Sequence, residues 1–328
     1  MSALSESIDA DNIEQEIPIR VTRSDNEAYL NIVHRLNRLS IKKRHDAYLD
    51  VDWEGADFQI LEDDSRWVLG PDIGLAHTDW YQSLPPQDKA KIGLYWIASK
   101  MKVGLIFENV LKRGLLNFAM TLPNGTPEFR YAYHEVIEEA QHSLMFQEFV
   151  NRSGFDVPGL SRTDELASRA IVSMARYFPE LFFIFVLGGE DPIDYVQRKI
   201  LRNRSSDIHP LLERIMRIHV TEEARHLSFA RQYLIRRIPE LSIWRRAVLA
   251  VAAPVTLGSM AQLMMKPSKD MIRRFSIPSD VVREAFGDNT EHRNDTLAAL
   301  AKVRDLCVKV GIVTAGSEWI WRALKIWE

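Results

Sequence analysis

Apolar residues recur every three to four positions over most of this chain, the spacing of one face of an α-helix. Four long segments carry the pattern: residues 86–122, 126–151, 163–187 with an interruption at Pro179, and 207–237. Shorter helices are expected at 26–49, 243–265, 278–286, 295–310 and 315–327. Since no useful stretch alternates with the period of a strand, the pattern predicts an all-α protein. Its core is a four-helix bundle with additional surrounding helices.

The domain boundaries follow from the same pattern. Residues 1–24 are polar and acidic with little periodicity, which predicts a flexible N-terminal arm. Residues 25–328 then form a single helical domain, with the bundle core at about 86–238. Within it, residues 50–85 are rich in turn formers and carry three tryptophans, so we expect irregular structure laid against the bundle.

Composition excludes several classes of protein. Apolar residues make up 46% and charged residues 27%, with a net charge of −3, so no nucleic-acid-binding surface is indicated. The single cysteine, Cys307, permits no internal disulfide and suits a reducing compartment. No signal peptide is visible, and the longest apolar runs, 181–189 and 247–257, are too short to span a bilayer. We therefore expect a cytoplasmic protein without a membrane partner.

One five-residue motif occurs twice. Glu138-Glu139-Ala-Gln-His142 and Glu222-Glu223-Ala-Arg-His226 share the form Glu-Glu-Ala-x-His, each within a long helical segment. Residues three apart lie on one helical face, so Glu139 pairs with His142 and Glu223 with His226. Two Glu-x-x-His motifs on separate helices are typical of ferritin-like di-iron bundles, which need one further glutamate from each of two other helices.

Glu108 is the first candidate for these single glutamates. It is the only acidic residue between residues 89 and 127 and stands on an apolar stripe, where an unpaired carboxylate is unusual. The alternative is an ion pair with Lys112 or Arg113.

Glu190 is the second candidate, because it directly follows the most apolar run of the chain. Asp194 and Glu180 compete with it. Gly188, Gly189 and Pro192 predict a kink or bulge at this point.

His219 adds a third imidazole, one turn before Glu223 on the same stripe. A lone histidine on an apolar face is more often a packed core residue, but its position beside a metal-binding carboxylate favours a ligand. The predicted metal ligands are Glu108, Glu139, His142, Glu190, His219, Glu223 and His226. Glu135 is a second-choice ligand.

Glu138 and Glu222 are expected just outside this set. Each would accept the second ring N–H of the ligand histidine on the opposite motif, unless both are simply solvated charges. Carboxylates with imidazoles suit iron, or less well manganese. Four carboxylates balance the four charges of a ferrous pair, which leaves a neutral site able to bind dioxygen.

The set resembles that of the p-aminobenzoate N-oxygenase (AurF-type) di-iron oxygenases, whose mark is the pattern His-x-x-x-Glu-x-x-His, matched by His219, Glu223 and His226. Glu139 and His142 match the family's earlier Glu-x-x-His, and Glu108 and Glu190 match its single glutamates by position. The resemblance implies a homodimer that uses dioxygen to oxidise an amine to a hydroxylamine, and often further to a nitroso or nitro group.

The resemblance also implies the partners of such an enzyme. The amine substrate is a small molecule or is tethered to a carrier, and in the arylamine type a C-terminal arginine holds the substrate carboxylate. Arg293 and Arg304 are the candidates here. Electrons come from an external donor, since the sequence carries no flavin, ferredoxin or nicotinamide motif.

Other bundle proteins remain alternatives. A ribonucleotide reductase small subunit or a fatty-acyl desaturase shares the paired Glu-x-x-His motif but leaves His219 unexplained. The reductase also needs a tyrosine near the metal, for which Tyr131 and Tyr133 are loose candidates. Iron storage is the non-enzymatic alternative, although the helices after Pro239 have no place in a short storage chain.

Overall fold

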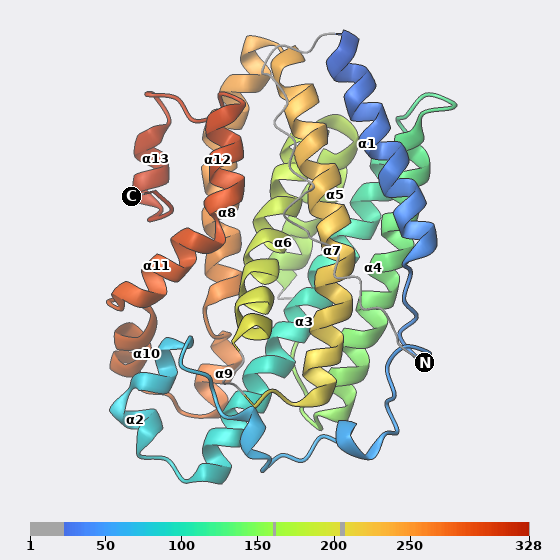
Figure 1. Cartoon of the computed structure of the whole chain (residues 1–328). Helices are drawn as coiled ribbons and strands as arrows, with labels where there is room; N and C mark the ends of the chain where they lie inside the picture. The colour runs from blue at the N-terminus through green and yellow to red at the C-terminus, as the bar shows by residue number, and fades with distance from the viewer. Residues whose placement is uncertain (1–22, 160–161, 204–206, 328) are drawn as a thin grey trace.

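The computed structural model describes residues 23–159, 162–203 and 207–327. Within these ranges the chain forms helices and connecting turns and contains no strand, which confirms the all-α prediction. Four long helices run side by side as a bundle: α3 Pro86–Ala119, α4 Pro127–Arg152, α6 Pro179–Arg202 and α7 Pro210–Arg237 (Figure 1). Each begins with a proline, whose fixed φ suits the first turn and whose missing N–H is not needed there.

The third bundle helix differs from the expectation. The segment expected from Thr163 is two helices, α5 Arg162–Tyr177 and α6, and α6 supplies the bundle position. Of the predicted kink or bulge, the bulge is wrong, since α6 remains α-helical through Gly188, Gly189 and Pro192, and the kink stays a prediction. The glycines instead permit close packing. A Cβ on Gly189 would lie 2.2 Å from a ring carbon of Phe107 in α3, and one on Gly188 would lie 2.9 Å from Leu257.

The remaining helices surround the bundle. Helix α1, Arg23–Lys42, packs on α4 and α7, while α8 and the helices after it lie on the opposite side (Figure 1). Their bounds are α8 Ile243–Met265, α9 Lys269–Arg274, α10 Ser279–Phe286, α11 Thr290–Ala299, α12 Ala301–Lys309 and α13 Glu318–Ala323. The helix expected over 295–310 is two helices, which meet at Leu300. The first helix ends seven residues before the expected Leu49, whose side chain is 87% exposed and would gain no burial from a longer helix.

The turn-rich segment after α1 lies across one end of the bundle, as expected. It contains the 3₁₀ turns η2 Ala56–Phe58, η3 Ser65–Trp67 and η4 Gly74–His77 and the short α2 Asp79–Gln82, while η5 Ile238–Glu240 follows α7. Trp67 is 1% exposed and packs edge-on against Phe149 of α4, with ring centroids 5.9 Å apart. The segment therefore closes that end of the bundle through its aromatic side chains.

Two apolar clusters fill the bundle at its two ends. One contains Leu211 to Ile218 of α7 with the C-terminal half of α4, and the other contains Leu227 to Ile235 with Tyr131 at the start of α4. The polar motif residues of α4 and α7 fall between the clusters, so the fold places them in the middle of the bundle, away from water.

One segment, Ile243–Arg274, is apolar and long enough to cross a bilayer by length and composition alone. Half of its most apolar window is buried, where α8 packs along α6 and α13, and Trp244, Val248, Val251 and Val255 of α8 are exposed. Of the expected flexible arm, residues 1–24, the first 22 residues lie outside the described part of the chain. Arg23 already belongs to α1. That residues 25–328 form one domain stays a prediction.

Candidate metal centre

Seven buried side chains meet in the middle of the bundle, and none is more than 3% exposed. They form two groups whose nitrogen and carboxylate oxygen atoms lie within 4.8 Å of one another. One group is Glu108, His142, His219 and Glu223, and the other is Glu139, Glu190, Glu223 and His226. These are the seven residues that the sequence proposed as ligands, and Glu223 belongs to both groups.

Glu139 and Glu223 occupy the central positions. The oxygens of Glu139 lie 2.9 Å from His142 Nδ1 and 2.8 Å from His226 Nδ1. Glu223 Oε1 lies 3.4 Å from His142 Nδ1 and 3.3 Å from His226 Nδ1. Each carboxylate therefore faces both histidines, as a ligand that bridges two metal ions must.

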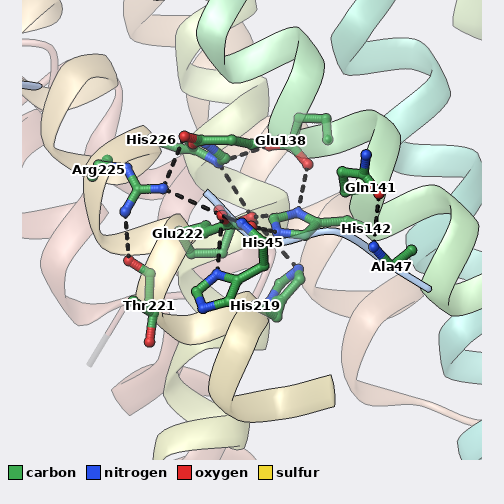
Figure 2. A network of polar contacts seen from close by, with 12 residues as sticks. His45, Ala47, Glu138, Gln141, His142, His219, Thr221, Glu222, Arg225 and His226 are labelled. Carbon is green, nitrogen blue, oxygen red and sulfur yellow. Dashed lines mark hydrogen bonds and ion pairs between the residues drawn. The ribbon is translucent and has the colours of Figure 1, made fainter. Parts of the chain in front are cut away.

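The two repeated motifs hold each other's histidines from outside. His142 Nε2 lies 2.9 Å from Glu222 Oε2, and His226 Nε2 lies 2.7 Å from Glu138 Oε2 (Figure 2). Each of these histidines thus donates its Nε2–H to a glutamate of the other helix and turns its Nδ1 to the centre. Neighbouring glutamates outweigh burial and raise the pKa of both rings, so each would lose its Nδ1 proton when it binds a metal ion. The repeat in the sequence has this crossed contact as its structural counterpart.

Two residues that the sequence analysis missed support these glutamates (Figure 2). Arg225 lies 2.9 Å from Glu138 and 3.5 Å from Glu222, so one guanidinium serves both. The backbone N–H of His45 donates to Glu222 Oε1 at 3.1 Å, and its Nδ1 lies 3.2 Å from the same oxygen. Burial opposes the charge of Glu222, but the contacts with His142 and His45 outweigh it and hold the pKa of Glu222 below its ordinary value.

His219 is oriented by a different residue, Gln197 of α6. His219 Nδ1 donates to Gln197 Oε1 at 2.9 Å, and Nε2 lies 3.5 Å from Glu223 and 3.7 Å from Glu108. Burial lowers the pKa of His219 to about 4, so the ring is neutral near pH 7. His219 therefore presents a free Nε2 lone pair to the centre. No sequence pattern indicated Gln197, because it lies on another helix.

The site buries four carboxylates together, which favours bound protons or a cation there. Burial, together with neighbouring carboxylates, raises the pKa of Glu108 and of Glu190 well above the ordinary value. Both carboxylate oxygens of Glu190 are buried without a hydrogen-bond partner among the described residues, which is costly unless something binds there. Carboxylates with neutral imidazoles are the donors that iron and manganese prefer, so these residues fit a pair of such ions.

The comparison with protein families matches residues 26–311 to the family of p-aminobenzoate N-oxygenase AurF. The chain belongs to the AurF family. This membership confirms the resemblance and makes the protein a di-iron oxygenase-type enzyme with a ferritin-like helical fold.

Curated relatives of this AurF-family chain come from mycobacteria. Proteins of Mycobacterium tuberculosis (strain H37Rv) and Mycobacterium bovis, both described as uncharacterised, are 39% identical to it over 303 residues. That alignment covers 92% of this chain and 89% of each relative. No solved structure matches the chain.

The competing residues have other partners. Glu180 lies 3.0 Å from Arg245, and Asp194 lies 2.8 Å from Arg198, so each is paired outside the centre. Lys112 does not pair with Glu108: its Nζ donates to Ser143 Oγ and to the carbonyl of Glu139.

Glu135 is buried beside the centre but belongs to neither group of four. Burial is the main cause that raises its pKa, to about 8, which favours a protonated carboxyl there. Tyr131, on the same helix, is also fully buried, and its hydroxyl has no hydrogen-bond partner among the described residues.

A cavity of about 280 Å³ leads to the centre and is lined mainly by apolar side chains. Glu108, Glu190 and His219 line it, so these three residues face the space in which a substrate can lie. Arg293 and Arg304 do not line it, and Arg304 donates to the carbonyl of Leu297 instead. Neither arginine is therefore placed to hold a substrate in this cavity.

Proposed function

We propose that this protein is an amine N-oxygenase with two iron ions held by the seven buried ligands. The observation that carries the proposal is His219, a neutral third imidazole whose Nε2 faces both Glu108 and Glu223. The AurF-family match supports it, whereas the reductase and desaturase alternatives give His219 no role.

The two groups of four suggest how the ligands divide. Glu108, His142 and His219 would serve one ion, Glu190 and His226 the other, and Glu139 and Glu223 would bridge them. Iron ions bound there supply dioxygen activation. Manganese is the lesser possibility, because the same donors accept it.

The protein's own residues would set the conditions of the reaction. Glu138 and Glu222 fix the two histidine rings, and the apolar clusters at both ends of the bundle keep water from the centre. The cavity admits the amine on the side of Glu108, Glu190 and His219. For one turnover, the amine, dioxygen, two electrons and two protons give the hydroxylamine and water. Further cycles would give nitroso or nitro products.

The two electrons require an external donor, a protein or a small reductant. We further propose a cytoplasmic homodimer acting in secondary metabolism on a small or carrier-tethered amine.

Elemental analysis and product analysis test the function together. Purified protein loaded anaerobically with ferrous iron should approach two equivalents of iron per chain, and Glu223→Ala should lose most of both, because Glu223 belongs to both ligand groups. Mass spectrometry after incubation with aryl and alkyl amines, dioxygen and a reductant should show added oxygen on nitrogen. Two bound irons without any oxidised amine would favour storage, and one tightly held zinc would reject the di-iron assignment.

A further inference from the structure

Three cationic side chains line the cavity, and two of them already have carboxylate partners. Arg66 donates to both oxygens of Asp64, at 3.0 Å each. Lys199 lies 2.8 Å from Asp72 and 2.9 Å from Asp295. Their charges are therefore neutralised within the protein and are not available to a ligand.

Lys100 is the third cation, and it lacks such a partner. Its Nζ donates to the carbonyl of Lys266 at 2.7 Å and lies 4.6 Å from the centroid of the Trp96 ring, but no carboxylate of the described residues pairs with it. Burial lowers the pKa of Lys100 to about 7, which shows how little the surroundings compensate its charge. His292, which also lines the cavity, stands near Lys100, and burial with the charges of Lys266 and Lys100 lowers the pKa of His292, while Asp295 opposes that shift.

The position of Lys100 gives a length for the ligand. Lys100, Gly104 and Glu108 all line the cavity from one face of α3, each about one helical turn after the one before. A rise of 1.5 Å per residue separates the Cα atoms of Lys100 and Glu108 by about 12 Å along the helix axis, so the ligand length is of this order. An extended chain covers this length in roughly ten single bonds, since three backbone bonds span 3.3–3.6 Å.

We propose that the cavity binds an elongated amine whose far end carries an anionic group, a carboxylate or a phosphate, and that Lys100 binds that group. The amine end lies against Glu108, Glu190 and His219, and the apolar walls hold the chain between the ends. The identity of the reacting end rests on the proposed function, whereas the anion site rests on Lys100 alone.

Calorimetric titration of the full-length protein tests the anion site without turnover. The probes are decanoate, decyl phosphate and the neutral decanol, which share one chain length. A charge-assisted hydrogen bond to Lys100 should make at least one anion bind about tenfold tighter than decanol or more. Which anion binds tighter identifies the group. Equal affinity for decanol and both anions would overturn the proposal, and this comparison needs no variant.

Variants assign the effect to Lys100. Lys100→Met keeps the apolar stem and should abolish the preference for the anion, while Lys100→Arg should retain it. Lys102→Met is the matched control, because Lys102 stands on the same helix, bonds to Gln147 and does not line the cavity. An anion preference that survives Lys100→Met would refute the assignment.

Turnover separates this inference from the proposed function. Lys100→Met should raise KM for 10-aminodecanoate about tenfold and leave kcat unchanged, with no effect on decylamine. If neither amine is oxidised while decanoate still binds through Lys100, the proposed function fails and the anion site stands. If decylamine is oxidised and Lys100→Met leaves KM for 10-aminodecanoate unchanged, the anion site fails and the proposed function stands.

Discussion

Glu222→Gln tests the crossed arrangement of the two motifs. The substitution keeps the shape of the side chain but removes the negative charge that His142 Nε2 contacts at 2.9 Å and that His45 and Arg225 also face. Loss of such a partner typically weakens metal binding ten- to a hundredfold, about 1.4–2.8 kcal/mol. His142 belongs to only one of the two ligand groups, so only one of the two iron equivalents should weaken.

Ferrous titration against a competing chelator measures the two equivalents. In Glu222→Gln, the titration curve should show one iron equivalent that binds as tightly as in the wild type and one that binds more weakly. Glu138→Gln should weaken the other equivalent, the iron whose ligand group includes His226. Glu213→Gln is the control, since Glu213 pairs with Arg217 on the outside of the same helix. If Glu222→Gln binds both irons as the wild type does, or weakens both alike, the assignment of Glu222 to His142 is refuted.

Further predictions concern the ligand set, the packing around it and its protons. His219→Ala should keep most of the iron, because the substitution removes a neutral donor without changing the charge of the site. It should lower the rate of amine oxidation by about tenfold or more and change the absorption spectrum that develops after the reduced protein is mixed with dioxygen. Unchanged turnover would make His219 a packed core residue. Gly189→Ala should destabilise the fold by about 1–3 kcal/mol in urea unfolding, because its Cβ would overlap Phe107, whereas Gly70→Ala, which meets nothing within 4 Å, should not. Neighbouring glutamates outweigh burial and raise the pKa of His142 to about 10, whereas a histidine that binds metal must be neutral. Iron affinity should therefore rise with pH, and iron loading should release protons. Affinity that is constant between pH 6 and 8 would contradict this.

Much of the fold could be predicted from local sequence, because helical periodicity and helix boundaries are local properties. The prolines at the first turn of all four bundle helices and the repeated Glu-Glu-Ala-x-His motif are visible without any structure. The same reasoning failed at Gly188 and Gly189. Glycine indicates that space or conformational freedom is needed there, and only the packing of Phe107 and Leu257 against α6 shows that space is the reason.

The candidate site divides in the same way. The sequence by itself determined the residue types and their helical faces, so it grouped Glu139 with His142 and His219 with Glu223 and His226. Only the tertiary structure decided what lies opposite each face. Gln197 lies against His219, and His45 and Arg225 lie against the outer glutamates. Lys100, in the cavity, meets a backbone carbonyl and pairs with no carboxylate of the described residues. These partners stand on other helices and loops, where spacing along the chain carries no information about distance. A buried charge is satisfied by whatever the fold brings within about 3 Å of it, and that is a property of the assembled bundle.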